Sequence, residues 1–149
     1  MITGDICNRT VTFVHRHTRL SDAARLMREN HVGSLVVVDE DARGRIPVGI
    51  ITDRDIVVEV LTADLDYRTL TAGEIMGKDL EIAREQDDVL DTLKLIRMRG
   101  IRRVPVVTRA GTLAGIVTID DLLEIVAEQL GDLVRAIARE QSREARLHA

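Results

Sequence analysis

Gly115-Ile116-Val117-Thr118-Ile119-Asp120-Asp121 has a twin earlier in the chain, Gly49-Ile50-Ile51-Thr52-Asp53-Arg54-Asp55. In each copy a glycine opens a short run of β-branched residues, which favours a buried strand. A threonine ends the run three residues before an aspartate, and an apolar helical pattern follows. Each copy therefore predicts a strand, a tight turn and a helix start, where free backbone N–H groups favour anions.

The same motif has a simpler interpretation. A Thr-x-x-Asp sequence before an apolar run is also a capping box, which satisfies helix N–H groups without any ligand. A single copy is more often a cap than a binding site, and the two roles do not exclude each other.

An internal repeat extends the match around both copies. A spacing of 69 residues aligns Gly4-Asp5-Ile6-Cys7 with Gly73-Glu74-Ile75-Met76, and it also aligns Val36-Val37-Val38 with Pro105-Val106-Val107. At the heptapeptides the spacing falls to 66 residues. The difference lies in turn-rich segments at 39–48 and 108–114, where insertions cost least.

Each repeat predicts a short strand, an amphipathic helix, a strand, a hairpin, a strand and a final helix. The main strands are nearly all apolar, as in a sheet covered on its faces; they are expected at 34–39, 46–52, 103–108 and 113–118. The expected fold class is α/β (α+β), with two β-α-β-β-α repeats packed as a pseudo-twofold pair, because each half is too small to be stable alone. The expected divisions are repeat one at 1–66, repeat two at 67–130, a polar connection at 62–72 and a C-terminal helical extension at 131–149.

The last helix of the second repeat is predicted to run beyond the repeat itself. Leu123, Val126, Leu130, Leu133 and Ile137 follow a 3-4-3-4 spacing, which indicates a helix-pairing seam of about two heptads. Either this seam packs on its own domain or it contacts a second subunit, and the sequence leaves both explanations open.

Composition restricts the class of protein. The chain has 149 residues, 45% of them apolar, with one Phe, one Tyr and no Trp, so its core must be aliphatic. It shows neither an apolar run of about 20 residues nor the pattern of a signal peptide, so a cytoplasmic protein is expected. A net charge of −4 argues against nucleic acid or membrane as partners. The single cysteine, Cys7, is expected in the core.

Catalytic and metal-binding patterns are not found. No Ser/His/Asp or Cys/His grouping occurs, and neither a phosphate-cradling Gly-x-x-x-x-Gly-Lys loop nor a Gly-x-Gly-x-x-Gly turn is present. The pair His15 and His17 lacks a third ligand nearby. We therefore expect no enzyme and no metal site.

Taken together, these motifs resemble a tandem pair of cystathionine-β-synthase (CBS) domains, also called a Bateman module. The resemblance covers about residues 1–130 and rests on the two Gly-apolar-apolar-Thr-x-x-Asp motifs, the upstream Asp-Ile-Cys and Glu-Ile-Met segments and the Val-rich strands. It implies a regulatory rather than a catalytic protein, with adenosine-type ligands in two clefts between the repeats and assembly as a homodimer.

By this resemblance, the aspartate of each motif would bind ribose and the threonine would face phosphate, with a basic pair before the second strand assisting. The residues expected in the stronger cleft are Thr118, Asp121, Arg102 and Arg103, with Thr10, Val11, Thr12, Val32, Gly33 and Ser34 on the adenine side. The residues expected in the weaker cleft are Thr52, Asp55, Arg54, Leu80, Ile101 and Pro105. This cleft is expected to be the weaker one because Asp79 and Glu81 replace Thr10 and Thr12 there, and both would repel phosphate.

The predicted function is a ligand-sensing module that binds AMP, ADP or ATP, with or without Mg²⁺, requires no other cofactor and signals to an unknown effector protein in trans. Two alternatives remain open at this stage. One is a ligand-free scaffold that acts through its C-terminal helix, and the other is a sensor of S-adenosylmethionine or NAD(H).

Overall fold

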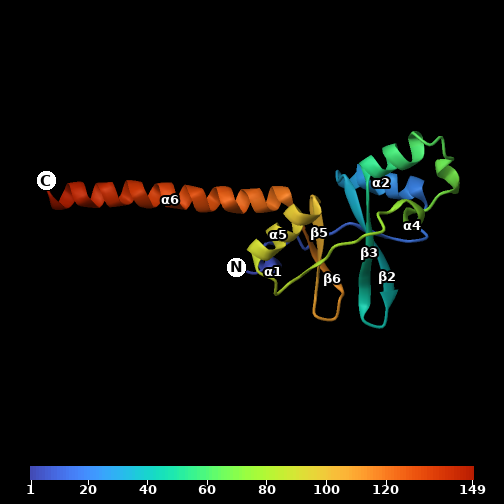
Figure 1. Ribbon diagram of the computed structural model, residues 1–149, viewed down its shortest axis with the longest axis horizontal. Helices are drawn as coiled ribbons and strands as arrows, with labels where there is room; N and C mark the ends of the chain where they lie inside the picture. The colour runs from blue at the N-terminus through green and yellow to red at the C-terminus, as the bar shows by residue number, and fades with distance from the viewer.

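Two three-stranded sheets, one from each repeat, form the centre of the computed structural model, which describes residues 1–149 (Figure 1). Both sheets have a parallel first pair and an antiparallel second pair. The first sheet contains β1 (Phe13–His15), β2 (Ser34–Asp41) and β3 (Gly44–Thr52). The second contains β4 (Ala83–Arg84), β5 (Arg103–Val107) and β6 (Leu113–Thr118).

The helices follow the same order in both repeats, which confirms the predicted β-α-β-β-α plan and the α/β class. Helices of the first repeat are α2 (Leu20–Asn30) and α3 (Asp53–Asp55), the latter continuing as a π-helical segment, Ile56–Leu61. Helices of the second repeat are α5 (Val89–Arg99) and α6 (Ile119–Leu147). The short segments are α1 (Thr3–Ile6), a 3₁₀ turn (Tyr67–Thr69) and α4 (Ala72–Ile75).

The two repeats share details that only a common backbone would produce. Each antiparallel pair has one register shift, between Val37 and Val38 in the first sheet and between Val106 and Val107 in the second. The strands of the first hairpin are longer, so the length difference between the repeats lies in the hairpins, as the alignment predicted.

Each repeat has its own aliphatic core. The first is built around Leu20, Leu35 and Ile51, and the second around Val104 and Val117, all almost fully buried. The two core clusters are separate, and the two sheets contact each other through β3 and β6. This arrangement differs in detail from the expected burial of one sheet against the other.

The opening segment of each repeat packs on the other repeat. Cys7 is buried in the second core, and the buried hydroxyls of Thr3 and Thr92 lie 2.7 Å apart in a hydrogen bond. Reciprocally, Ala72 donates its N–H to the Thr18 carbonyl and is buried in the first core. The predicted division at residue 66 follows the sequence repeat, whereas packing exchanges the first segment of each half. The two halves are thereby interlocked.

The glycine that opens each heptapeptide makes this exchange possible. A Cβ atom on Gly115 would lie 2.7 Å from the Cys7 sulfur and 2.8 Å from the Asn8 carbonyl oxygen. That carbonyl accepts the Ile116 N–H at 2.9 Å, so the segment cannot retreat without losing a hydrogen bond. A Cβ atom on Gly49 would meet only the side chain of Met76, which can move.

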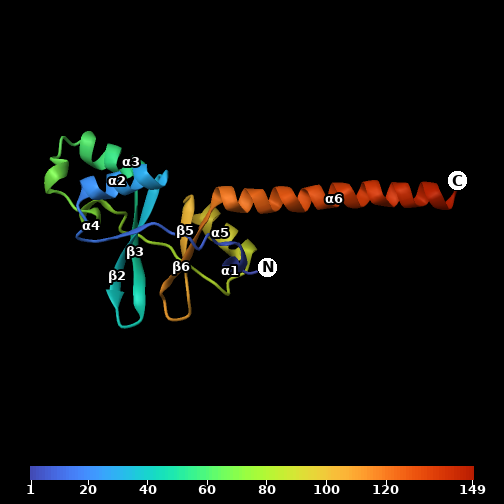
Figure 2. The same ribbon diagram turned by 180° about the vertical axis from the view of Figure 1, so that it is seen from behind.

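Helix α6 extends well beyond the two repeats. Figures 1 and 2 show it leaving the second sheet and continuing away from the rest of the chain to the C-terminus. Leu122, near its start, is its only buried residue. The helix continues to Leu147, so residues 131–147 are helical as expected, although Gly131 costs about 1 kcal/mol relative to Ala.

Replacing Gly115 by Ala should therefore destabilise the protein more than replacing Gly49. We expect Gly115→Ala to lower the free energy of unfolding by about 1–3 kcal/mol, because its methyl group overlaps a backbone atom that is held in place. Gly49→Ala should cost less, since the Met76 thioether can change rotamer. Urea unfolding of both variants measures this difference, and equal costs would contradict the proposed origin.

Candidate functional site

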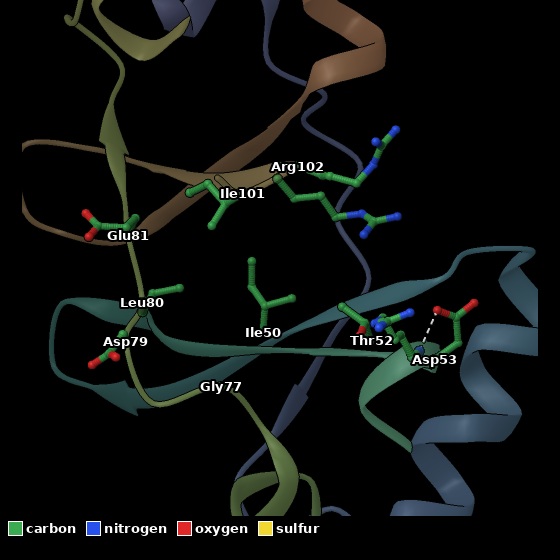
Figure 3. A pocket seen from close by; sticks show the side chains of 11 residues that line it. Ile50, Thr52, Asp53, Gly77, Asp79, Leu80, Glu81, Ile101 and Arg102 are labelled. Carbon is green, nitrogen blue, oxygen red and sulfur yellow. Dashed lines mark hydrogen bonds between the residues drawn. The ribbon is translucent and has the colours of Figure 1, made fainter. Parts of the chain in front are cut away.

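A cavity of about 470 Å³ lies between the two repeats (Figure 3). Its walls are formed by the end of β3 from the first repeat and by two segments of the second repeat. One of these segments lies before β4, and the other lies at the start of β5. Its lining residues are Ile50, Thr52, Asp53, Arg54, Gly77, Asp79, Leu80, Glu81, Ile101, Arg102 and Arg103. We call it the Thr52 cavity.

The middle of the Thr52 cavity is apolar. Ile50, Leu80 and Ile101 project into the space between the repeats, and each is only partly buried (Figure 3). Together these side chains, from both repeats, form an aliphatic surface on which a flat ring of a ligand could pack. Ligand pockets commonly combine such a surface with a few polar groups that fix orientation.

One end of the cavity is cationic. Arg102 and Arg103 enter from the second repeat, and Arg54 enters from the first, beside Thr52. Arg102 has a single long ion pair, 3.8 Å from its Nη2 to Asp120 Oδ1, while Arg54 and Arg103 take part in no ion pair of the chain. Three guanidinium groups outnumber the one carboxylate at this end, that of Asp53, and they suit a phosphate, which accepts their paired N–H donors.

Two of the three acidic residues of the cavity, Asp79 and Glu81, lie at the other end, whereas Asp53 lies beside Thr52 and Arg54. The carboxylates of Asp79 and Glu81 point away from Arg102 in Figure 3. Glu81 is neutralised by Arg99, whose Nε lies 3.0 Å from its Oε1. The expected repulsion between these carboxylates and a phosphate is therefore reduced by distance and, for Glu81, by pairing.

A smaller cavity of about 210 Å³ occupies the pseudo-twofold equivalent position. We call it the Thr118 cavity. It is lined by Asn8, Thr10, Val11, Thr12, Val32, Gly33, Ser34, Val36, Arg103, Ile116 and Thr118. The structure thus brings together Thr118 and the whole set of residues expected on the adenine side, from opposite repeats.

Arg102 is not where the sequence comparison placed it. It was expected beside Thr118, but its side chain lines the Thr52 cavity. The reason is the repeat itself: Arg102 corresponds to Gly33, whose carbonyl makes the equivalent backbone bond, and Gly33 lines the other cavity. Arg103 lines both cavities. The Thr118 cavity therefore has one arginine and the Thr52 cavity three, the reverse of the predicted ranking.

Asp55 and Asp121 form capping boxes and line neither of these two cavities. The Thr52 N–H donates to Asp55 Oδ2 at 2.8 Å, and the Asp55 N–H donates to Thr52 Oγ1 at 3.0 Å. The same pair of bonds joins Thr118 and Asp121, at 3.0 and 3.1 Å. The simpler interpretation of the motif is thus present in both copies, and a role in ribose binding remains a prediction.

Some cavity residues were missed, and Pro105 is a further expected residue that lies elsewhere. Asp53, Ile50 and Gly77 line the Thr52 cavity although the sequence did not single them out. Two of them could have been found from the sequence, because Ile50 and Asp53 lie within the repeated heptapeptide. Pro105 is buried inside β5, where it pairs with Ile116, and does not line the cavity.

Groups outside the cavities have ordinary structural partners. Burial raises the pKa of the Cys7 thiol, which keeps it protonated and unreactive. His15 Nε2 lies 3.0 Å from Glu40 Oε1, and its ring stacks on His17. No group of three metal-ligating side chains occurs, and no helix is long and apolar enough to span a membrane.

Comparison with known proteins gives the family. The sequence profile of the CBS domain matches residues 3–62 and 72–128. Hypoxic response protein 1 of Mycobacterium tuberculosis is 37% identical over 134 residues, which cover 89% of this chain and 91% of the relative. An uncharacterised protein of Methanopyrus kandleri is 34% identical over 122 residues, covering 82% of this chain but 61% of the relative.

Solved structures agree with this match. A crystal structure of hypoxic response protein 1 with two coordinated zinc ions has a TM-score of 0.73 at 36% identity, covering 83% of this chain and 98% of that one. The CBS domain pair of protein MJ0100, in complex with 5′-methylthioadenosine and S-adenosyl-L-methionine, has a TM-score of 0.74 at 26% identity. The match covers 87% of this chain and 98% of that one. A hexameric CBS-CP12 protein from cyanobacteria has a TM-score of 0.71 at 26% identity, and the match covers 95% of this chain and 88% of that one.

The fold and its cavities define a module of two interlocked β-α-β-β-α repeats that meet around a pseudo-twofold axis. This chain belongs to the CBS domain family, as a tandem pair with a long C-terminal helix. CBS domain proteins are typically regulatory rather than catalytic.

The capping box at Thr118 should contribute measurably to stability. Thr118→Ala removes the acceptor for the Asp121 N–H, and we expect the free energy of unfolding to fall by about 1 kcal/mol. Ser142→Ala, on the exposed part of the same helix, is the control and should change little. Urea unfolding monitored by circular dichroism makes the comparison, and a Thr118→Ala variant as stable as its control would argue against the cap.

Proposed function

We propose that this protein is a regulatory sensor of adenosine nucleotides, which bind in the Thr52 cavity. The observation that carries the proposal is the cavity's division into an aliphatic middle and an end with three arginines. An adenine ring suits the aliphatic part, and a phosphate suits the guanidinium groups of Arg54, Arg102 and Arg103. The ligand would thus contact both repeats at once.

The arginines distinguish between adenosine-type ligands. The MJ0100 domain pair, a structural neighbour, has 5′-methylthioadenosine and S-adenosyl-L-methionine bound, which supports adenosine chemistry in this kind of cleft. S-adenosylmethionine carries a sulfonium cation near the ribose, and three nearby arginines disfavour it. AMP, ADP and ATP carry anionic phosphates at that position, and so does NAD(H). Nucleotides with phosphates are therefore the favoured class.

The proposed ranking of the cavities follows the charges. The Thr52 cavity binds the more anionic ligand more tightly, and the Thr118 cavity, with Arg103 alone, binds more weakly. Thr52 and Thr118 supply hydroxyl donors in their cavities, and Asp55 and Asp121 lie one helical turn further on. Because Arg103 lines both cavities, its loss should weaken binding at both.

The regulatory output would travel to a separate effector protein. A ligand changes the protein only by the difference in its affinity for two arrangements of the repeats. A nucleotide held by Arg54 from one repeat and Arg102 from the other would favour the arrangement that brings these residues together. We place this action in the cytoplasm, where the single cysteine remains reduced.

Thermal unfolding with candidate ligands tests the proposal. At about 100 times its dissociation constant, a ligand specific for the folded state adds about 2.7 kcal/mol of stability. AMP, ADP and ATP, with and without Mg²⁺, should raise the melting temperature, whereas S-adenosylmethionine should raise it less. If none of these ligands, nor NADH, shifts the transition, the sensor proposal is wrong and the scaffold alternative, supported by the exposed apolar stripe of α6, is favoured.

Calorimetric titration of Arg102→Ala identifies the cavity. Losing one charge-assisted phosphate contact, worth about 1.5–3 kcal/mol, should weaken nucleotide binding roughly 10- to 100-fold. Arg109→Ala, in the hairpin loop and outside both cavities, is the matched control and should bind as the parent does. Unchanged affinity in Arg102→Ala, with binding lost in Thr118→Ala, would instead place the tight site in the other cavity.

A further inference from the structure

Helix α6 carries an apolar stripe whose side chains are all exposed in its own chain. Val126, Leu130, Leu133 and Ile137 repeat at intervals of four, three and four residues, so they lie on one face of the helix. Their exposed fractions are 46%, 58%, 63% and 58%. The sequence left open whether this seam packs on its own domain, and the structure shows that it does not.

A helix in this position lacks the usual source of helical stability. Figures 1 and 2 agree that α6 runs away from both repeats along most of its length. In proteins, most helical stability comes from packing an amphipathic face, and Gly131 lowers the intrinsic preference further. The outer part of α6 therefore requires a partner surface of matching length and apolar character.

The charges along α6 indicate which partner fits. Residues 119–132 contain five carboxylates and no Lys or Arg. Residues 133–147 contain four arginines, Arg135, Arg139, Arg143 and Arg146, and two glutamates. The first half is thus strongly acidic and the second half is net basic. A second copy of the same helix complements this pattern only when it runs in the opposite direction.

We propose that α6 pairs with α6 of a second copy as an antiparallel two-helix coil. Leu130 of one copy lies opposite Leu133 of the other, and Val126 lies opposite Ile137, so that four apolar layers form around a twofold axis. The acidic half of each helix then lies along the basic half of the other. The helix dipoles also oppose each other, which is favourable.

A parallel pair would be disfavoured by the next seam positions. Continuing the spacing beyond Ile137 reaches Glu140 and Glu144. In a parallel, in-register coil, each glutamate would face its own copy across the seam, and like charges there repel. In the antiparallel pair Glu140 lies opposite Leu123, where its aliphatic stem can pack while its carboxylate remains in water.

The antiparallel arrangement also fits the rest of the molecule. Each pair of repeats lies at the N-terminal end of its α6, so the two bodies are placed at opposite ends of the coil. The pairing surface includes none of the residues that line the Thr52 cavity. The dimer can therefore form whether or not a nucleotide is bound, and this inference does not depend on the proposed function.

Sedimentation equilibrium of the full chain tests the pairing. The parent protein should be a dimer at micromolar concentration, and the double variant Leu130→Glu/Leu133→Glu should raise the dimer dissociation constant by about 100-fold or more, since unpaired charges would be buried. Ala138→Glu adds a charge to the same helix outside the seam and should remain dimeric. A monomeric parent, or a double variant that dimerises as well as Ala138→Glu does, overturns the proposal. Because the substituted leucines are exposed in one chain, the thermal transition of the repeats should persist and show that the double variant is folded.

Helix direction is tested by a distance measurement. A spin label on Ser142→Cys lies on the outer face of α6, and Cys7 is buried and should not react. In the antiparallel pair the two labels are separated by 21 residues along the axis, about 30 Å at 1.5 Å per residue. In a parallel pair the labels would lie at the same height on opposite outer faces, roughly 20 Å apart, which is the interaxial distance plus one helix radius on each side. The short distance would overturn the antiparallel arrangement.

Discussion

The close contact between each repeat's first segment and the other repeat's central glycine constrains the whole molecule. Cys7 and Asn8 lie directly against Gly115, and Met76 lies against Gly49. No side chain larger than hydrogen fits at Gly115 without displacing a hydrogen-bonded backbone. Because each half supplies part of the other's core, neither half is complete alone, and the spacing between the repeats is set by these contacts.

That interlock also determines where the cavities form. It brings the segment at 77–81 beside the end of β3, and it brings residues 8–12 beside the end of β6. Each cavity therefore has walls from both repeats, and a ligand within it would report on their relative position. The repeats are equal in backbone but not in charge, since Gly33 and Ser34 occupy in one cavity the positions that Arg102 and Arg103 occupy in the other.

Helix α6 shows how a feature outside the repeats can be as specific as those within them. Its start is fixed by the Thr118 and Asp121 capping box and by Leu122, which is buried. Beyond that point its apolar face and its divided charges have no counterpart in the chain. The proposed module therefore has two separate surfaces, a cavity between the repeats for a small ligand and the apolar face of α6 for association with a second copy.

The sequence by itself determined the repeat, the order of the elements, the hairpins that differ in length and the two heptapeptide motifs, because these depend on local periodicity and on turn chemistry. The group of residues around Thr118 was expected from the resemblance to tandem CBS domains, and these residues line one cavity in the structure. The structure decided which cavity holds Arg102, because a side chain's neighbours depend on how the two repeats pack, and there Arg102 takes the place that Gly33 takes in the other cavity. Only the structure, likewise, showed that Asp55 and Asp121 line neither cavity, that opening segments are exchanged and that the α6 seam is exposed, since burial depends on contacts between residues far apart in the chain.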